Sequence, residues 1–409
     1  MPVFTSSIEV TADYPTIKPS LNLNFVKARA LDPRVTLERA SDATYIGRDG
    51  LVKYAGEDEP RFDHDPYTLE CLGLLLEESR TNLAEYGTII SGTGWYSQPT
   101  FGTNLNDSIS PDGTANATRI TNLNSQSDPD LYSFEQFAIG SSKTITHSIY
   151  VKSPDAANVG KEINFRGKRT VGTASSWGQK FILTAEWQRV TITHTYQSDN
   201  TQGRAYIGAD PNTTDPAGAA TACLFWGLQV EEGSFATSFI PTSGSTVTRA
   251  VDEAYILGDN VPLGSGVDEY SFYVRGRLLD TNNYAGISRG LVGMGSSSSN
   301  RIRIPHNNAG AVEIYSGGSV VAQLFTSDIG TTERQIALAV KKDDFAMSMD
   351  GGTVQTDTSG DIPSSIDTIG LGQSSYDAPP VTYPSTCYIR EFRIYPKRLT
   401  NAQLQLLTS

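Results

Sequence analysis

Short runs of alternating apolar and polar residues recur along most of the chain, separated by segments rich in Gly, Pro, Asn and Asp. The segment 145–151 places its apolar residues on one face of an extended strand, and the even-numbered positions of 224–230 do the same. A period of two residues is typical of a half-buried β-strand. The pattern therefore predicts antiparallel sheets over the middle of the chain.

The C-terminal part repeats this alternation in 270–278 and 336–340. Turn signals follow at 341–344 and again at 350–352, where Asp-Gly-Gly favours a tight hairpin. Near the end, Thr400 stands three residues before Gln403, which is a capping-box spacing and predicts a short helix that reaches Leu407.

We therefore predict an all-β protein of tandem antiparallel β-sandwich domains of jelly-roll type, preceded by an extended N-terminal arm. Three prolines in the first residues oppose a helix there, and the arm packs either on its own domain or on a neighbouring subunit. The predicted parts are an arm at 1–25, a β module at 26–90, a jelly roll at 91–248 and a second β-sandwich at 249–409.

Two short segments depart from the general pattern. Residues 74–82 are rich in Leu, Glu and Arg and predict a short helix. Residues 39–46 resemble residues 249–256, with five of the eight positions identical. We interpret the two segments as equivalent strands that enter a sandwich, with chance similarity as the alternative.

The charge of the chain bears on its partners. The sequence has 45 acidic and 32 basic residues, for a formal net charge of −13. A protein that binds nucleic acid normally carries a basic surface, so we expect no nucleic-acid partner.

The most apolar segment, 72–76, is too short to cross a bilayer, and the N-terminus lacks the pattern of a secretory signal. We therefore expect no membrane insertion.

The cysteines do not suggest a disulfide framework. Cys71, Cys223 and Cys387 are odd in number, far apart and without the spacing of a zinc site. We expect all three to be reduced and buried, which suits a protein made in a bacterial cytoplasm.

Several segments carry a resemblance to known families. Residues 19–25, 59–66 and 73–83 resemble the N-terminal module of bacteriophage structural proteins. The middle of the chain is similar to carbohydrate-binding-module jelly rolls found in the same proteins; the similar segments are 110–114, 150–152, 187–190, 226–231 and 233–242. The last part resembles concanavalin A-like or laminin G-like lectin domains at Phe345, 350–352 and 389–399.

This resemblance implies a phage virion protein, made in the host bacterial cytoplasm, whose module at 26–90 attaches it to the particle. The expected function is that of a tail fibre or another receptor-facing component that binds host-surface polysaccharide without catalysis. The expected partners are other virion proteins, and three-fold tail appendages suggest a homotrimer. The alternatives are a capsid decoration or tail-shaft protein with a purely structural role, and a polysaccharide depolymerase.

The sequence offers no convincing catalytic centre, so we expect no enzyme. His147 and His194 lie on apolar strand faces, where a structural role is the better interpretation. The acidic pairs 231–232 and 343–344 fall in predicted turns, and neighbours in sequence do not reach the separation of a glycosidase pair. The segment 63–65, Asp-His-Asp, could hold a cation or a base, but a hydrogen-bonded turn before Pro66 accounts for it.

Sugar binding requires an aromatic plane beside amides and carboxylates. Two places fit: the aromatic pair after the Gly- and Ser-rich segment 91–94, and a Pro-containing loop at 373–383. The candidate glycan-binding residues are Trp95, Tyr96, Gln373, Tyr376, Asp377 and Tyr383. Core packing remains an alternative for Trp95 and Tyr376, and it is the expected role of Trp187 and Trp226.

No cofactor is expected. A structural calcium ion is possible, because lectin-like sandwiches use loop oxygens for this purpose. Asp112 and Asp377 are the weak candidates for its ligands, since neither belongs to a dense acidic set.

Overall fold

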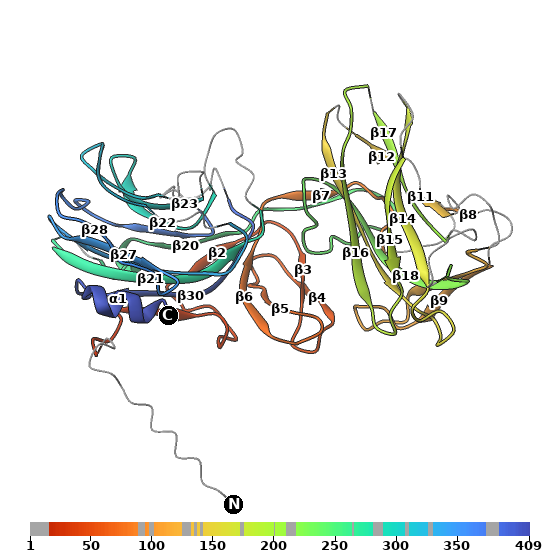
Figure 1. Ribbon diagram of the computed structural model, residues 1–409, viewed down its shortest axis with the longest axis horizontal. Coiled ribbons are helices and arrows are strands. Elements are labelled where there is room, and N and C mark those ends of the chain that lie inside the picture. Colours follow the sequence, from red (N-terminus) through yellow and green to blue (C-terminus); the bar gives the residue numbers. More distant parts are fainter. Residues whose placement is uncertain are drawn as a thin grey trace, which may run out of the picture. The chain divides into compact units, whose positions relative to one another are not determined.

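The computed structural model of the protein describes residues 16–88, 95–97, 102–124, 132–134, 137–139, 142–171, 176–199, 201–209, 218–263, 266–280, 289–306, 311–325, 330–373 and 384–409. In this part of the chain every paired strand is antiparallel, which confirms the all-β fold class (Figure 1). The regular helical structure there is limited to α1 (Asn401–Leu407) and the 3₁₀ turn η1 (Gly258–Asn260). No described helix is long and apolar enough to cross a membrane.

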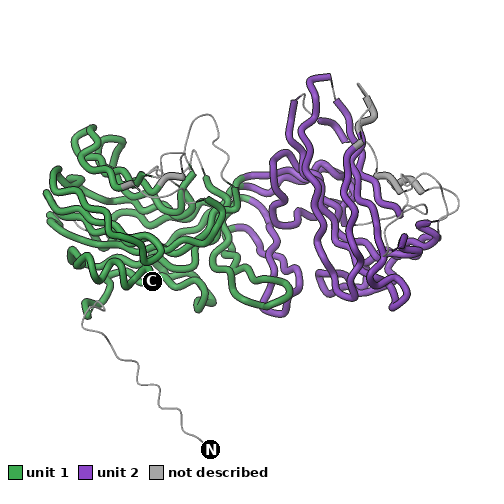
Figure 2. The backbone as a smooth tube through the Cα atoms, in the orientation of Figure 1, with its two compact units in different colours: residues 1–40, 58–78, 251–409 green, residues 41–57, 79–250 purple. Residues whose placement is uncertain are grey.

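The chain forms two compact units, and neither is continuous in sequence (Figure 2). Unit 1 contains residues 1–40, 58–78 and 251–409, and unit 2 contains residues 41–57 and 79–250. The predicted jelly roll and C-terminal sandwich correspond to most of these two units. The segment 26–90, in contrast, is divided between both units, because its strands complete sheets whose other strands lie far along the chain.

Unit 1 is a sandwich of two sheets around one hydrophobic core. The eight-stranded sheet has, in order, β28 (Gln355–Asp357), β27 (Phe345–Met349), β26 (Arg334–Lys341), β21 (Glu269–Leu278), β30 (Cys387–Tyr395), β6 (Cys71–Leu76) and β5 (Phe62–His64), with β1 (Leu21–Asn24) also paired to β30. The seven-stranded sheet has β2 (Thr36–Glu38), β20 (Glu253–Leu257), β29 (Thr368–Leu371), β22 (Arg289–Ser297), β23 (Asn300–His306), β24 (Ala311–Ser316) and β25 (Ser319–Phe325).

The N-terminal strands belong to this sandwich. Strand β1 pairs with β30, with Leu21 opposite Ile394, and its two leucines are buried in the core of unit 1. The part of the predicted arm from residue 16 onward therefore packs on its own unit. Residues 1–15 lie outside the described part of the chain.

Helix α1 covers part of the outer face of the eight-stranded sheet. Leu404 and Leu407 pack against the small side chains of Ala337, Ala339 and Ala346 on β26 and β27. The predicted capping box is confirmed: the Thr400 side chain accepts a hydrogen bond from the Gln403 amide, and the Gln403 side chain accepts one from the Thr400 amide. The two predicted turns are confirmed as well, with positive φ at Asp343 and at Asp350.

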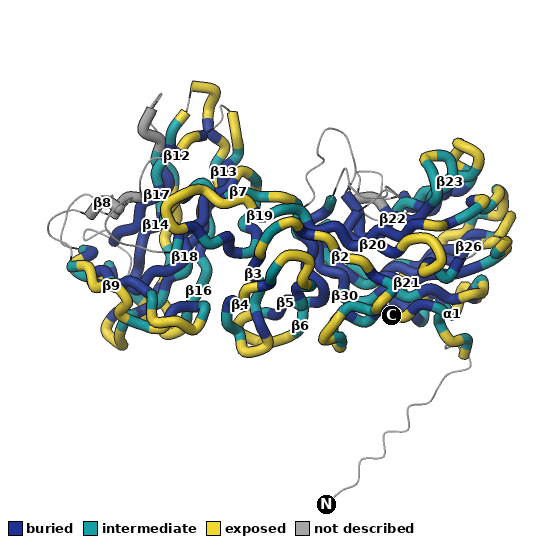
Figure 3. The backbone as a smooth tube through the Cα atoms, turned by 180° about the vertical axis from the view of Figure 1, so that it is seen from behind, coloured by how far each residue is buried: buried dark blue, intermediate teal, exposed yellow. Residues whose placement is uncertain are grey.

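Unit 2 is a second sandwich, with buried strand residues between two sheets (Figure 3). The five-stranded sheet has β16 (Gln188–Thr195), β13 (Thr144–Lys152), β18 (Ala222–Glu232), β10 (Ala117–Thr121) and β9 (Gly102–Ser108). The six-stranded sheet has β15 (Ser176–Ile182), β14 (Glu162–Val171), β17 (Gln202–Gly208), β11 (Tyr132–Phe134) and β8 (Trp95–Ser97), with β12 (Phe137–Ala138) paired to β17. Two-stranded sheets add β7 (Arg80–Asn82) with β19 (Val247–Arg249), and β3 (Ala43–Ile46) with β4 (Val52–Ala55).

Strand β18 does not keep the alternation predicted for 224–230. Gly227 has a φ of +67°, and the register against β13 shifts by one residue beside it, so the strand carries a β-bulge. Phe225 and Leu228 therefore both face the core between the sheets, whereas Trp226 packs on the other side against Phe239. Trp226 is fully buried, as predicted, and Trp187 is partly buried against the same cluster.

The predicted helix at 74–82 is wrong. This segment contains strands β6 and β7 instead. Leu74 and Leu76 point into the core of unit 1, and β6 pairs with β30 more than 300 residues further along the chain. Burial in a sheet overrides the modest intrinsic preference of Leu and Glu for helix.

The two similar segments also have different surroundings. Residues 43–46 form β3 in a two-stranded sheet, whereas residues 253–257 form β20 in the seven-stranded sheet, so the predicted equivalence of the strands is wrong. They share another property: in each, the chain leaves one unit directly after an Arg-Ala pair, at Ala40 and at Ala250.

All three cysteines are free. Cys223 and Cys387 are buried, as predicted, and burial raises the pKa of both thiols. Cys71 differs from the prediction because it is only partly buried, at the start of β6.

Candidate functional site

Trp95 and Tyr96 lie in strand β8 and not in a loop. Strand β8 is at the edge of the six-stranded sheet of unit 2 and pairs with β11, with Tyr96 opposite Ser133. The side chains of these residues lie outside the described part of the structure. Their role as glycan contacts therefore remains a prediction, and it concerns residues of an edge strand instead of a loop.

The second predicted group is only partly described. Gln373 is fully buried, and its backbone bridges to Pro384, so its prediction as a surface contact is wrong. Strand β29 and Gly372, which has a φ of +69°, directly precede it. Tyr376, Asp377 and Tyr383 lie outside the described residues, so their proposed contacts and the metal role of Asp377 remain predictions.

Asp112 organises its own loop. One carboxylate oxygen accepts hydrogen bonds from the Ser110 hydroxyl, the Thr114 amide and the Thr114 hydroxyl at 2.6, 2.9 and 2.7 Å. Although burial opposes ionisation, these hydrogen bonds from Ser110 and Thr114 hold the pKa of Asp112 below its usual value. Among the described residues no group of three His, Cys, Asp or Glu side chains could hold a metal ion.

The other acidic candidates have structural partners. The interpretation of 63–65 as a turn before Pro66 is wrong for its first two residues, because Asp63 and His64 are buried in strand β5. The turn comes after them, at 66–68, where the Asp65 carboxylate accepts the amides of Tyr67 and Thr68. The placement of Glu231 in a solvated turn is wrong: it is fully buried in β18, where its carboxylate accepts hydrogen bonds from Gln229 and Thr237. This bond pattern fixes the exit of the chain from β18 and leaves no pair of free carboxylates there.

The outer face of the six-stranded sheet in unit 2 gathers polar side chains that the sequence analysis did not identify. Polar and apolar residues alternate at the start of strand β14, and its apolar residues Ile163 and Phe165 point into the core of unit 2. Because successive side chains of a strand point to opposite faces, Asn164, Arg166 and Lys168 point outward.

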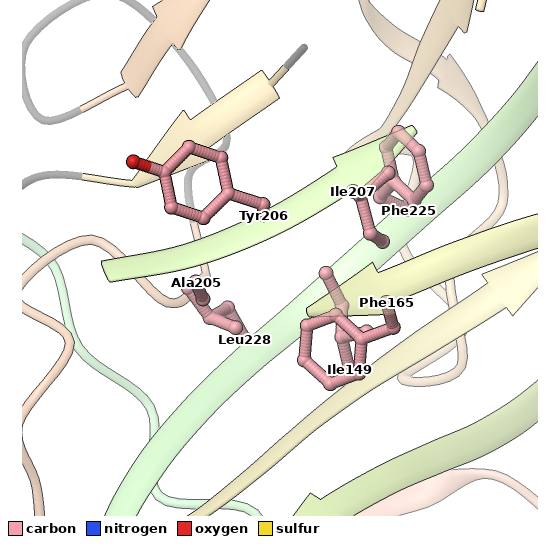
Figure 4. A pocket seen from close by; sticks show the side chains of 7 residues that line it. All are labelled: Ile149, Phe165, Ala205, Tyr206, Ile207, Phe225 and Leu228. Atoms are coloured by element: carbon pink, nitrogen blue, oxygen red, sulfur yellow. The ribbon is translucent and has the colours of Figure 1, made fainter. Parts of the chain in front are cut away.

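Strand β17 repeats this arrangement beside β14. Ala205 and Ile207 belong to the core, and Tyr206 points to the other side of the strand, as Figure 4 shows. Arg204 shares the outward face with Tyr206, since the two are separated by one residue.

The strand register brings these side chains together. Arg166 is directly opposite Tyr206, and Lys168 is directly opposite Arg204. The Lys168 ammonium lies 5.7 Å from the centre of the Tyr206 ring. On its other side Tyr206 is opposite Ser133, which in turn is opposite Tyr96. Four strands thus contribute to one line of positions across the sheet. We call the cluster of Asn164, Arg166, Lys168, Arg204 and Tyr206 the Tyr206 face.

The Tyr206 face is basic in an acidic protein. Three cationic side chains share the face with Tyr206, and all three are partly buried. Tyr206 is 8% exposed and Asn164 is 3% exposed, so the base of the face is well packed. The Asn164 Nδ2 is buried and has no hydrogen-bond partner among the described residues, and the same holds for the Arg204 Nε. Buried donors without a partner are uncommon in folded proteins, and they mark places where a ligand or water can bind.

The interior of this sandwich is not a ligand site. A gap of about 10 Å³ lies between Ile149, Phe165 and Leu228 (Figure 4). This volume is at the lower limit for one water molecule, and the lining is almost entirely apolar. The gap is a small packing defect of the core.

Comparison with known proteins gives no family for the chain. No family model matches it, and no curated protein matches it. Similar folds occur among solved structures. Domain 4 of AbnA, a GH43 extracellular arabinanase from Geobacillus stearothermophilus, solved with arabinotriose, is 14% identical, with a TM-score of 0.31, over 43% of this chain and 82% of that domain.

Two further structures are similar at the same level. The CBM22-1 xylan-binding domain of Paenibacillus barcinonensis Xyn10C is 14% identical, with a TM-score of 0.26, over 38% of this chain and 94% of that domain. The botulinum neurotoxin serotype C1 binding domain is 14% identical, with a TM-score of 0.31, over 39% of this chain and 40% of that domain. The similar structures are thus β-sandwich domains, among them carbohydrate-binding ones.

Proposed function

We propose that this protein binds a glycan through the Tyr206 face of unit 2 and does not cleave it. The observation that carries the proposal is that two paired strands place guanidinium, ammonium and amide donors on one face with Tyr206, whose ring centre lies 5.7 Å from the Lys168 ammonium. Sugars present hydroxyl oxygens that accept such hydrogen bonds and C–H faces that contact aromatic rings. A rigid sheet holds these donors in place and lowers the entropy lost on binding.

The wider role that we propose is adhesion of a phage particle to its host. The resemblance of the chain to phage structural proteins supports this role, as does the presence of two sandwich units in one chain. Weak contacts with single sugars gain affinity when many copies bind one surface, and a homotrimer would provide such copies. The alternative is a decoration protein, and the position of the protein on purified particles, at the tail or over the capsid, distinguishes the two.

Substitution at the Tyr206 face tests the proposal. In Arg166→Gln the side chain keeps its approximate size but loses its charge, and we expect binding to host-surface polysaccharide to weaken about tenfold, the usual effect of losing one charge-assisted hydrogen bond. Arg119→Gln is the matched control. Arg119 lies in β10 of the opposite sheet, where it pairs with Asp107 at 3.1 Å.

Biolayer interferometry with immobilised polysaccharide measures both variants. Equal binding of the two variants would exclude the Tyr206 face as the glycan site. The length of the polysaccharide is measured after incubation with the intact protein, and shortened chains would contradict the proposed absence of catalysis.

A further inference from the structure

A second surface with the features of a ligand site lies in unit 1. A hollow of about 290 Å³ opens on the outer face of the eight-stranded sheet, close to the size of small-ligand pockets. Strand β6 contributes Leu72, β21 contributes Arg277, and β30 contributes Tyr388 and Arg390. The segment before β26 completes the lining with Thr331, Thr332 and Glu333.

The carboxylate in this hollow is neutralised from both sides. One oxygen of Glu333 pairs with Arg275 at 2.5 Å, and the other pairs with Arg390 at 3.0 Å. Arg390 also pairs with Glu70 at 2.7 Å. These ion pairs fix the positions of Glu333 and Arg390 and engage both terminal nitrogens of the Arg390 guanidinium.

Arg277 is different from its neighbours. Its guanidinium carbon lies 5.4 Å from the centre of the Tyr388 ring, which is a cation–π distance. Among the described residues it makes no ion pair and no hydrogen bond. Tyr388 is itself held in place, because its hydroxyl donates a hydrogen bond of 2.5 Å to the buried carboxylate of Asp63. Burial raises the pKa of the Tyr388 hydroxyl, which keeps it protonated as this donor.

The hollow therefore contains a positioned guanidinium with unused donors. The exposed hydroxyls of Thr331 and Thr332 stand on the same wall. Leu72 adds an apolar contact. A planar guanidinium with free N–H groups matches the two oxygens of a carboxylate, and such charge-assisted pairs are stronger than neutral hydrogen bonds.

We propose that this hollow is a binding site for a carboxylate-bearing sugar residue, such as a uronic acid within an acidic polysaccharide. Arg277 binds the carboxylate, the threonine hydroxyls bind ring hydroxyls, and Leu72 contacts the C–H face. The remaining lone pairs of Glu333 accept sugar hydroxyls, which a peptide carboxyl terminus does not supply. The size of the hollow limits the ligand to about one sugar ring.

The site belongs to unit 1 alone and uses no residue of the Tyr206 face. An experiment that shows no binding at one of the two sites therefore does not contradict the proposal for the other site. Together the two sites would give one chain two independent contacts with a surface polysaccharide, which increases overall affinity when both can be engaged.

Titration of the full-length protein with D-galacturonate and with D-galactose tests the proposal, because the two sugars differ only in the carboxylate at C6. We expect saturable binding of galacturonate, detected by NMR or calorimetry, and binding of galactose weaker by about tenfold or more. Arg277→Gln should weaken galacturonate binding by about the same factor. Arg303→Gln, which affects a pair with Glu313 on the other sheet, should leave galacturonate binding unchanged.

Thr332 provides a test that does not disturb the packed base of the hollow. Because Thr332 is exposed, Thr332→Glu should leave the fold intact and repel the carboxylate, whereas Thr332→Gln should not. Equal binding of galactose, unchanged affinity in Arg277→Gln and Thr332→Glu, or no galacturonate binding by the folded protein would each overturn the proposal. Displacement of galacturonate by a dipeptide at lower concentration would overturn the assignment to a sugar.

Discussion

His147 is a fully buried residue with an unusual environment. Its ring stands 5.4 Å from the ring of Phe137, 6.4 Å from Phe165 and 6.0 Å from Trp177, all measured between centres. Neither ring nitrogen has a hydrogen-bond partner among the described residues. Burial, and secondarily the charge of His194, lowers the pKa of His147 to about 3. The imidazole is therefore neutral in the folded protein.

This environment predicts a pH dependence of unit 2. An unfolded histidine has a pKa of about 6.5, so below that pH the unfolded chain takes up a proton that the folded chain does not. As the pH is lowered from about 6.5 to 3, the free energy of unfolding should then fall by about 1.4 kcal/mol for each pH unit. In His147→Phe, which keeps an aromatic ring in the cluster, this contribution should disappear. Urea unfolding of both proteins at several pH values, followed by tryptophan fluorescence, measures the difference, and parallel pH curves would contradict it.

At the level of single residues, the sequence identifies a type of role better than a location. His147 was predicted to be structural and is buried, because it shares an apolar strand face with Ile145 and Ile149. Glu231 and Gln373 were predicted at the surface and are buried. Their burial depends on partners that only the folded chain supplies, such as Thr237 for the carboxylate of Glu231.

At the level of elements, a cluster of four buried charges joins distant strands of unit 1. Asp252 pairs with Arg39 at 3.0 Å and with Arg61 at 2.5 Å, and Arg61 also pairs with Glu77 at 2.5 Å. All four side chains are at most 1% exposed. The backbone amide of Glu77 donates a further hydrogen bond to Asp252. Two carboxylates thus neutralise two guanidinium groups where the segments after β2 and β6 meet the segment before β20.

Removal of one member of this cluster should be costly. Asp252→Asn leaves two buried guanidinium groups with one carboxylate, and loss of one partner from a buried ion pair costs about 3–5 kcal/mol. Asp361→Asn is the matched control, because Asp361 pairs with Lys342 at 3.6 Å on the surface, where such a pair contributes at most about 1 kcal/mol. Guanidinium chloride unfolding of both variants measures the two free energies. Similar losses would mean that the buried cluster contributes no more than a surface pair.

Most strands follow from alternation in the sequence, but two features of the elements do not. The bulge at Gly227 reverses the faces of β18 halfway along, and a glycine inside an alternating run gives only a weak sign of it. Residues 74–82 contain good helix formers, and only the distant partner strand β30 makes Leu74 to Leu76 extended. Such features depend on contacts far apart in sequence.

At the level of the whole molecule, the candidate sites could not be predicted from the sequence. The Tyr206 face requires the register of β14 against β17, so Arg166 meets Tyr206 across about 40 residues of chain. The hollow in unit 1 combines Leu72 with Arg277 and Tyr388. Alternating basic residues at 166 and 168 in an acidic chain were a usable signal for the first site. No local pattern indicates the second.

The discontinuous units also govern which fragments can fold. A fragment of residues 251–409 lacks the strands β1, β2, β5 and β6, which bury Leu21, Leu37 and Leu74 in the core of unit 1. Without them the core is open and the edges of β20 and β30 are unpaired, and unpaired edges favour aggregation. We expect this fragment to show no cooperative unfolding, whereas residues 79–250 keep both sheets of unit 2 and lose only the hairpin that contributes Val52 beside Trp226.

Circular dichroism and urea unfolding of the two fragments measure this contrast. Residues 79–250 should unfold cooperatively, with a loss of about 1–3 kcal/mol relative to unit 2 in the full chain, because the hairpin with Val52 is absent and Trp226 and Phe239 lose the burial that it provides. Addition of residues 16–78 as a separate peptide should restore structure to residues 251–409, since it supplies all four missing strands. Cooperative unfolding of residues 251–409 alone, unchanged by that peptide, would show that the C-terminal sandwich is a domain in its own right and that the N-terminal strands only decorate it.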